Sequence, residues 1–247
     1  MPGHQGKIAV ITGAAGALGR EFALALASRG CDIAIADIQD ASGVVAEIRA
    51  TGQRAYSEIV DLSDAEQVSQ FADNVLNEFG QVDILVNNAA FMPVIPLAEL
   101  DLATFRKFEA INVEAAFILG KTFGMGMAER GYGRIVQIAS STTGTAMPGF
   151  SAYVTTKMAG IGLTRALAAE FSSSGVRVNA LSPGLTRTPE SAKNLPPQLF
   201  DNVKNNLQLI KQTEEPQDLT GALLFLTSEE CGFVTGQTIN CDGGVNF

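Results

Sequence analysis

Residues 7–19 read KIAVITGAAGALG, an apolar run followed at once by a glycine-rich turn. The run Lys7–Thr12 is typical of a strand that is buried on both faces, and a helical pattern follows over Glu21–Arg29. Glycines in such a turn permit a tight bend and a close approach of the backbone to a pyrophosphate, which the free N–H groups of the helix would bind. Many proteins without a cofactor also join strands to helices through glycine, so the turn alone leaves both interpretations open.

The same alternation of short apolar runs and longer amphipathic stretches continues along the chain. The further strand-like runs are Asp32–Ala36, Ala55–Val60, Val82–Val86, Arg134–Ala139 and Val176–Leu181. This order predicts an α/β fold, a doubly wound parallel sheet of about seven strands with helices on both faces. A length of 247 residues predicts a single domain over residues 1–247.

Composition argues against several classes of partner. The net charge is −9, and no cluster of Lys and Arg is present to bind nucleic acid or an anionic membrane. No stretch reaches the ~20 apolar residues that span a bilayer, and the start lacks a signal-peptide pattern, so we expect a cytoplasmic protein. The three cysteines lack CxxC spacing, which predicts neither a disulfide framework nor a metal site.

Asp37 ends the second run, 18 residues after Gly19. Its carboxylate could accept hydrogen bonds from an adenosine ribose and would repel a 2′-phosphate. Because no Arg or Lys flanks it, NAD(H) is favoured over NADP(H). The alternative is an aspartate that caps a turn at the end of a strand.

Tyr153 and Lys157 lie four residues apart in a stretch with helical periodicity, Gly149–Phe171, so they share one helix face. An ammonium beside a phenol stabilises the phenolate and lowers its pKa, and such a phenol could exchange a proton with an alcohol or carbonyl oxygen. The same spacing also arises by chance in many helices.

Other residues extend this pattern along the chain. They are Asp61-Leu62, Asn87-Asn88-Ala89, Asn112, Ser140 and Pro183-Gly184. Together with the glycine turn and the Tyr153/Lys157 pair, they resemble the short-chain dehydrogenases/reductases over essentially the whole chain. The resemblance implies a Rossmann-type fold and hydride transfer between a nicotinamide dinucleotide and a carbonyl or alcohol carbon.

The resemblance also implies roles for four catalytic residues. Tyr153 is the expected proton donor and acceptor, and Ser140 hydrogen-bonds the substrate oxygen. Lys157 lowers the pKa of Tyr153 and binds the nicotinamide ribose, while Asn112 positions a water that connects Lys157 to solvent.

The cofactor residues implied by the resemblance follow the chain in order. They are Gly13, Gly16, Ala17, Leu18 and Gly19 for the pyrophosphate; Asp37 and Ile38 for the adenosine end; Asp61 and Leu62 for adenine; Asn88 and Ala89 for the adjoining ribose; Tyr153 and Lys157; and Pro183, Gly184, Thr186 and Thr188 for the nicotinamide, with Thr188 at its carboxamide.

Three residues depart from the family pattern. Ala17 replaces a glycine, so its β-carbon could crowd the pyrophosphate unless Gly16 lets the turn shift. Ala90 also stands where the family pattern has glycine, so we expect it to accept a backbone conformation usually given to glycine. Thr186 stands where an apolar β-branched residue is common.

The residues expected to face the substrate are mostly apolar. They are Phe91, Met92, Ser140, Thr142, Ala146, Phe150, Leu195 and Phe200. They favour an apolar or aromatic secondary alcohol or ketone, and some stretches are similar to the aryl-alcohol (phenylethanol) dehydrogenases of the family. We interpret Pro183–Pro197 as a loop and residues 185–212 as a substrate-binding lid.

Two alternatives remain, together with an expectation about assembly. A 3-oxoacyl thioester reductase would share the fold but should prefer NADPH and carry basic residues for an acidic carrier, which Asp37 and the net charge oppose. A catalytically silent dinucleotide-binding protein would keep the fold without turnover. The resemblance implies a homodimer or homotetramer formed through the helices that carry Asn112 and Tyr153.

Overall fold

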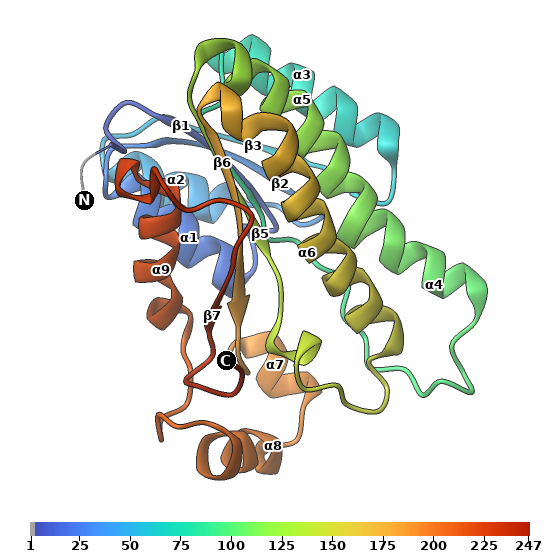
Figure 1. The fold of residues 1–247 in the computed structure, drawn as a ribbon. Helices are drawn as coiled ribbons and strands as arrows, with labels where there is room; N and C mark the ends of the chain where they lie inside the picture. Colours follow the sequence, from blue (N-terminus) through green and yellow to red (C-terminus); the bar gives the residue numbers. More distant parts are fainter. Residues whose placement is uncertain (1–2) are drawn as a thin grey trace.

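One parallel sheet of seven strands organises residues 3–247, which the computed structural model describes (Figure 1). The spatial order of the strands is β3-β2-β1-β4-β5-β6-β7. Their bounds are β1 Ile8–Thr12, β2 Asp32–Asp37, β3 Ala55–Ile59, β4 Ile84–Asn87, β5 Gly133–Ile138, β6 Val176–Pro183 and β7 Thr238–Cys241. The predicted doubly wound sheet is therefore confirmed, with β7 as a strand for which no range was predicted.

Helices cover both faces of this sheet (Figure 1). Apolar residues of α1, α2 and α9 pack in one core with β1 and β2, and those of α3, α5 and α6 pack in a second core on the other face. The helix bounds are α1 Ala17–Ala27, α2 Ser42–Ala50, α3 Ala65–Phe79, α4 Leu102–Glu109, α5 Ala115–Arg130, α6 Ser151–Phe171, α7 Pro189–Asn194, α8 Pro197–Asn202 and α9 Thr220–Thr227. Within the described residues, no helix is both long and apolar enough to cross a bilayer.

The sheet fixes where a ligand can bind. Strand β1 pairs with β2 on one side and with β4 on the other, so the strand order reverses at β1. In open α/β sheets ligands bind at such a switch point, beyond the carboxyl ends of the strands. The glycine turn after β1 and the segments after β4, β5 and β6 all lie at this edge.

The interpretation of Pro183–Pro197 as a loop was wrong. Pro183 ends β6, Pro189 begins α7, and Pro197 begins α8, which a π-helical turn, Val203–Leu207, continues. Thr188 caps α7, since its Oγ1 accepts a hydrogen bond from Ser191 N (3.0 Å) and its own N donates to Ser191 Oγ (2.8 Å). Proline at the first turn of a helix loses no hydrogen bond and presets φ, so these prolines start helices.

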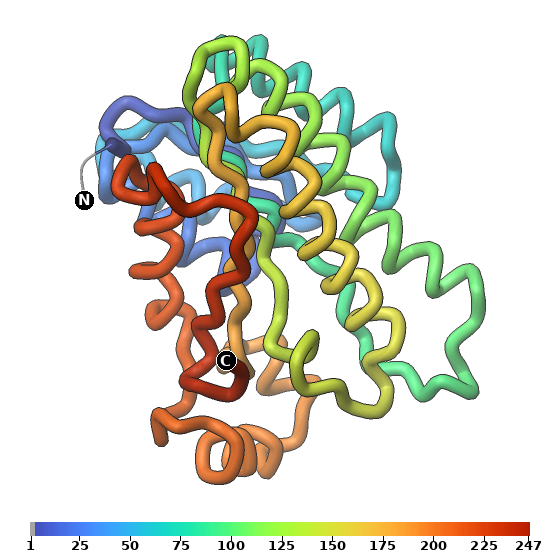
Figure 2. The backbone as a smooth tube through the Cα atoms, viewed as in Figure 1, coloured from blue at the N-terminus to red at the C-terminus, as the bar shows by residue number. Residues whose placement is uncertain are grey.

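The end of the chain holds two parts of this edge together. Figure 2 shows the chain ending beside the segment with α7 and α8. The Gly243 carbonyl accepts hydrogen bonds from Leu209 N and Ile210 N (both 2.9 Å). Asn246 Nδ2 donates to the carbonyl of Ser141 (2.9 Å), so the last residues brace both the predicted lid, residues 185–212, and the segment after β5.

Candidate active site

The glycine turn is built by a close approach of the ends of β1 and β4. Gly13 has a φ of 71°, and a β-carbon there would lie 2.8 Å from Ala89 Cα. Asn88 Nδ2 donates to Thr12 O (2.9 Å), and Thr12 Oγ1 accepts from Asn88 N and Ala89 N (3.0 Å each). These bonds tie the turn to the segment after β4, at the switch point.

Replacement of Gly19 by alanine tests this packing. The new β-carbon would lie 2.4 Å from Gly13 O and 2.7 Å from Asn88 Nδ2. We expect urea unfolding to show a loss of about 2–3 kcal/mol in the free energy of unfolding, because overpacking against backbone exceeds the gain in helix propensity. Gly16→Ala is the matched control, since its nearest contact would be 3.4 Å, and it should change stability by less than about 1 kcal/mol. Equal losses in both variants would contradict this account.

The departures at Ala17 and Ala90 are accommodated without unusual backbone. Among the described residues only glycines have positive φ, so the expectation of a glycine-like conformation at Ala90 was wrong. Gly16 has φ −77° and ψ 157°, a conformation open to any residue, and Ala17 is the first residue of α1. The turn therefore does not depend on the special freedom of Gly16.

An open groove of about 460 Å³ runs from the glycine turn to the start of α7. Its lining comprises Ala15, Ala17, Arg20, Glu21, Arg187, Pro189, Glu215, Pro216 and Gln217. Gly16 caps α1 without a side-chain hydrogen bond, and the first turn of α1 contains no acidic residue. Free N–H groups at an uncapped helix N-terminus favour an anion, so this groove fits the pyrophosphate of a dinucleotide.

Asp37 has the capping role considered for it and keeps room for the other. Its carboxylate accepts from Ala15 N (2.8 Å) and from Gln39 N (2.9 Å), so it caps the turn after β2 and also anchors the glycine turn. A carboxylate has about four acceptor positions, which leaves capacity for a ribose hydroxyl. Ile38 beside it is 63% exposed.

Asp61 and Leu62 follow β3. Ser63 donates two hydrogen bonds to Asp61, from its N (2.9 Å) and its Oγ (2.7 Å), and these lower the pKa of that carboxyl. Leu62 is buried. Their contact with adenine remains a prediction.

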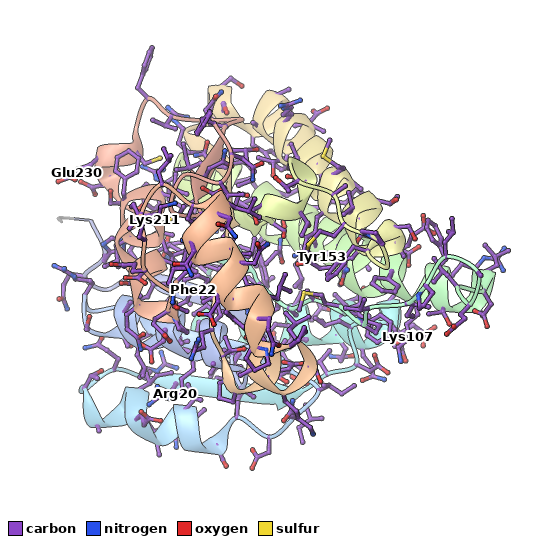
Figure 3. All side chains as sticks on the ribbon, turned by 90° about the horizontal axis from the view of Figure 1, so that it is seen from below. Arg20, Phe22, Lys107, Tyr153, Lys211 and Glu230 are labelled. Carbon is purple, nitrogen blue, oxygen red and sulfur yellow. The ribbon has the colours of Figure 1, made fainter. Side chains whose placement is uncertain are left out.

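The structure brings Ser140, Tyr153 and Lys157 together. Ser140 follows β5, the other two lie on one face of α6, and the side chain of Ser140 hydrogen-bonds the Tyr153 hydroxyl. Lys157 Nζ donates to the carbonyl of Ile138 (2.6 Å) and lies 5.5 Å from the centre of the Tyr153 ring. Figure 3 views the molecule from this end and labels Tyr153.

Burial controls both ionisable groups of this cluster. It raises the pKa of Tyr153 to about 12, opposed by the hydrogen bond with Ser140. It lowers the pKa of Lys157 to about 8. The expected lowering of the Tyr153 pKa by Lys157 is not seen in this structure, where Nζ bonds to the Ile138 carbonyl and burial dominates the pKa of the phenol.

Asn112 lies in a π-helical turn, Ala110–Glu114, between α4 and α5. Its Oδ1 accepts from Phe91 N (2.7 Å), and its Nδ2 donates to Phe91 O and to Thr156 Oγ1 (3.0 Å each). The widened turn lets one side chain connect the segment after β4 with α6, next to Lys157. Asn112 is thus beside the cluster, although the water expected there remains a prediction.

Two polar residues in this region were given no role from the sequence. Asn87 and Gln137 are buried, and both Asn87 amide atoms and Gln137 Nε2 have no hydrogen-bond partner within residues 3–247. They line a cavity of about 20 Å³ together with Asn112 and Lys157. A cavity of this size with several polar partners has room for one water. No motif signalled Gln137.

Comparison with known proteins assigns the chain to a family. Residues 13–246 match a family model described as enoyl-(acyl carrier protein) reductase. A 2,5-dichloro-2,5-cyclohexadiene-1,4-diol dehydrogenase of Sphingobium indicum is 36% identical over 252 residues, which cover 99% of this chain and 98% of the relative. The chain belongs to the short-chain dehydrogenase/reductase family.

Solved structures agree with this short-chain dehydrogenase/reductase over nearly their whole length. One is a putative NAD(P)-dependent gluconate 5-dehydrogenase of Beutenbergia cavernae with bound NADP, at 34% identity and a TM-score of 0.92, covering 98% of each chain. Another is an NAD⁺-bound xylitol dehydrogenase, at 29% identity and a TM-score of 0.88, covering 98% of this chain and 99% of that one.

The predicted substrate residues of this short-chain dehydrogenase/reductase divide into two groups. Phe91 and Phe150 belong to the apolar cluster around Tyr153, with the Phe150 and Tyr153 ring centres 6.0 Å apart. Thr142 Oγ1 donates to Ser140 Oγ (2.9 Å). Met92, which follows Phe91, and Ala146, six residues after Ser140, have exposed side chains. Phe200 is instead buried within the lid, where the Arg187 guanidinium lies 5.1 Å from its ring centre, and Leu195 is half-buried.

The segment after β6, which is predicted to contact the nicotinamide, contains a partner that the sequence did not signal. Glu214 is buried, and its carboxylate accepts hydrogen bonds from Gly184 N (3.1 Å) and Thr186 Oγ1 (2.5 Å). This contact explains why Thr186, and not an apolar residue, stands in the segment.

Proposed function

We propose that this short-chain dehydrogenase/reductase interconverts an apolar or aromatic secondary alcohol and its ketone, using NAD(H). The observation that carries the proposal is the buried Tyr153 hydroxyl, hydrogen-bonded to Ser140, with Lys157 one helical turn away. The aromatic residues Phe91 and Phe150 beside Tyr153 favour an apolar substrate. The aryl-alcohol branch remains one candidate within this class.

Each residue of the site has a defined task in this proposal. Ser140 binds the substrate oxygen, and Tyr153 gives it a proton in reduction or takes one in oxidation. Lys157 holds the nicotinamide ribose, and Asn112 connects Lys157 with a water in the cavity beside it. When bound, the nicotinamide supplies or accepts the hydride.

The burial of Tyr153 bears on the direction of the reaction. With a pKa of about 12, its phenol is protonated at neutral pH, which is the form that donates to a ketone oxygen. Oxidation needs the phenolate, which the hydrogen bond with the Ser140 hydroxyl would stabilise. Tyr153 can therefore serve both directions of the reaction, and oxidation is favoured as pH rises because more of its phenol is ionised.

The preference for NAD(H) rests on Asp37. A 2′-phosphate would be repelled by its carboxylate, and neighbouring Ile38 provides no positive charge. We expect Asp37→Ser combined with Ile38→Arg to raise the ratio of kcat/KM with NADP to that with NAD by about 10- to 100-fold, since a charge-assisted hydrogen bond replaces a repulsion. Asp40→Ser, which removes an exposed carboxylate three residues away, is the control and should leave the ratio unchanged. An unchanged ratio in the double variant would refute the assignment of Asp37.

A panel of substrates tests the reaction class. Purified protein is assayed by NADH and NADPH absorbance with apolar secondary alcohols, their ketones, polyols and a 3-oxoacyl thioester. We expect turnover of apolar alcohols and ketones with NAD(H). The thioester reductase is retained as an alternative because the matched family model is described as enoyl-(acyl carrier protein) reductase, whose substrates are also acyl thioesters. Reduction of the 3-oxoacyl thioester with NADPH alone would replace our proposal by it. Binding of NADH without turnover of any substrate would establish the silent binding protein instead.

We also propose a cytoplasmic homodimer or homotetramer that acts on a small molecule. Exposed apolar side chains support self-association: Phe117 (48%) and Met125 (53%) on α5, and Met158 (50%) on α6. Light scattering of the purified protein measures the oligomeric state, and a monomer at micromolar concentration would contradict this part of the proposal.

A further inference from the structure

The carboxylate of Glu214 contacts the segment that follows β6. It lies 30 residues from Gly184 and 28 from Thr186, yet its two oxygens accept one hydrogen bond from each of them. A short parallel bridge between Thr186 and Glu214 fixes the two backbones, and Arg187 N donates to Glu214 O (2.7 Å). A β-carbon at Gly184 would lie 2.8 Å from Glu214 Oε2, so the segment closely surrounds this carboxylate.

The contact with Glu214 determines the polarity of the Thr186 hydroxyl, that is, whether it donates or accepts a hydrogen bond toward a ligand. A hydroxyl has one proton to donate and two lone pairs to accept with. Because the proton of Thr186 is donated to Glu214, its hydroxyl presents only lone pairs to a ligand. Thr188 has the opposite character, since its Oγ1 accepts from Ser191 N and keeps a proton free to donate.

We propose that Glu214 is a positioning residue that makes the Thr186 hydroxyl a hydrogen-bond acceptor for the amide nitrogen of the nicotinamide carboxamide. Thr188, as a donor, then complements the amide oxygen, so the two threonines together match an unsubstituted carboxamide. This inference rests on the proposed function, because it assumes that a nicotinamide binds at this segment.

Ionisation of Glu214 controls this polarity. Burial raises the pKa of Glu214 to about 7, opposed by its hydrogen bonds with Thr186 and Gly184. The titratable groups that face it are Asp242 and Asp218, which raise its pKa further, and the Cys241 thiol. A protonated Glu214 could donate to Thr186, which would turn the Thr186 proton toward the ligand.

The test compares two dinucleotides that differ only in the amide. Fluorescence titration gives the dissociation constants of NADH and of the reduced analogue in which an acetyl group replaces the carboxamide and so lacks the N–H donors. For the wild type at pH 8 we expect about tenfold tighter binding of NADH, the effect of one good hydrogen bond. The preference should shrink as pH falls below about 7, where Glu214 gains its proton.

Glu214→Gln and Thr186→Val test the same polarity from two sides. Gln keeps the size and can still accept from Gly184 N, but its amide donates to Thr186 and reverses the hydroxyl. Val keeps the shape of Thr186 without the hydroxyl. We expect both variants to bind NADH and the analogue within about twofold of each other, without pH dependence near 7. Glu230→Gln, which removes an exposed charge far from the segment, should retain the wild-type preference.

The outcomes are distinguishable. A tenfold preference that persists in either variant, or a wild type without preference, would overturn the role of Glu214 and leave the proposed function intact. A wild type that binds neither dinucleotide would overturn both. Since each variant is compared with its own binding of the analogue, a general loss of stability does not imitate the expected result.

Discussion

Tyr153→Phe is expected to lower kcat/KM by about 10³-fold, within the 10²–10⁴-fold range of general acid–base catalysis. The hydroxyl is the only group removed, and the phenyl ring keeps its contact with Phe150 in the apolar cluster. Binding of NADH, measured by fluorescence, and the melting temperature should stay close to those of the wild type. The loss then belongs to the chemical step and not to binding.

Tyr132→Phe is the matched control for this variant. The Tyr132 hydroxyl is also buried, has no hydrogen-bond partner within residues 3–247 and lies outside the cluster. Its removal should leave kcat/KM unchanged and cost no stability, because it relieves an unsatisfied polar atom. If Tyr153→Phe lost less than about tenfold in activity, the assignment of Tyr153 would be refuted.

Lys157→Met is expected to lower kcat/KM by at least about 10²-fold and to weaken NADH binding, because it removes both the ammonium beside Tyr153 and a predicted ligand of the ribose. Met has a similar length and can occupy the same buried space. The control is Arg29→Met, which removes an exposed cation from the turn after α1 and should change neither quantity. Retained NADH affinity together with retained turnover in Lys157→Met would refute both roles.

The same variant should change how stability depends on pH. Burial lowers the pKa of Lys157 from 10.5 to about 8. Between these values the unfolded chain holds a proton that the folded chain has released, so the free energy of unfolding rises with pH in this window, by on the order of 1–3 kcal/mol. In urea unfolding from pH 7 to 10.5, Lys157→Met should lack this rise. Parallel pH profiles for wild type and variant would show that the folded protein does not lower this pKa.

The sheet was predictable because its central strands are buried on both faces. Runs such as Lys7–Thr12 and Val82–Val86 are almost continuously apolar, and this pattern depends only on local residues. The helices of the lid were not recognised, although the signals were present: Thr188 before Pro189 is a cap followed by a proline at the first turn. The error came from interpreting prolines as breakers where they start helices.

The candidate site was predictable where it depends on spacing along one element. Tyr153 and Lys157 share a face of α6 because they are four residues apart. Their pKa values were not predictable in the same way, since burial by the surrounding fold determines them and the sequence indicated only the opposing charge effect. The π-helical turn at Asn112 also had no recognised pattern.

Contacts between segments that are far apart in the sequence could not be predicted from the motifs. Glu214 meets Thr186 across 28 residues, and no spacing rule connects them. The sequence did single out Thr186 as an unusual residue, and the structure supplies its partner. A departure from a family pattern thus pointed to a real contact, whereas the departure at Ala90 did not require a positive φ.

The central claim is that hydrogen passes directly between the substrate carbon and a nicotinamide held beside Tyr153. Incubation of the protein with NAD⁺ and an apolar secondary alcohol deuterated at its carbinol carbon, followed by mass spectrometry of the reduced dinucleotide, tests it most directly. We expect one deuterium in each reduced dinucleotide and slower turnover than with the undeuterated alcohol. Reduced dinucleotide that carries only solvent hydrogen would contradict the account.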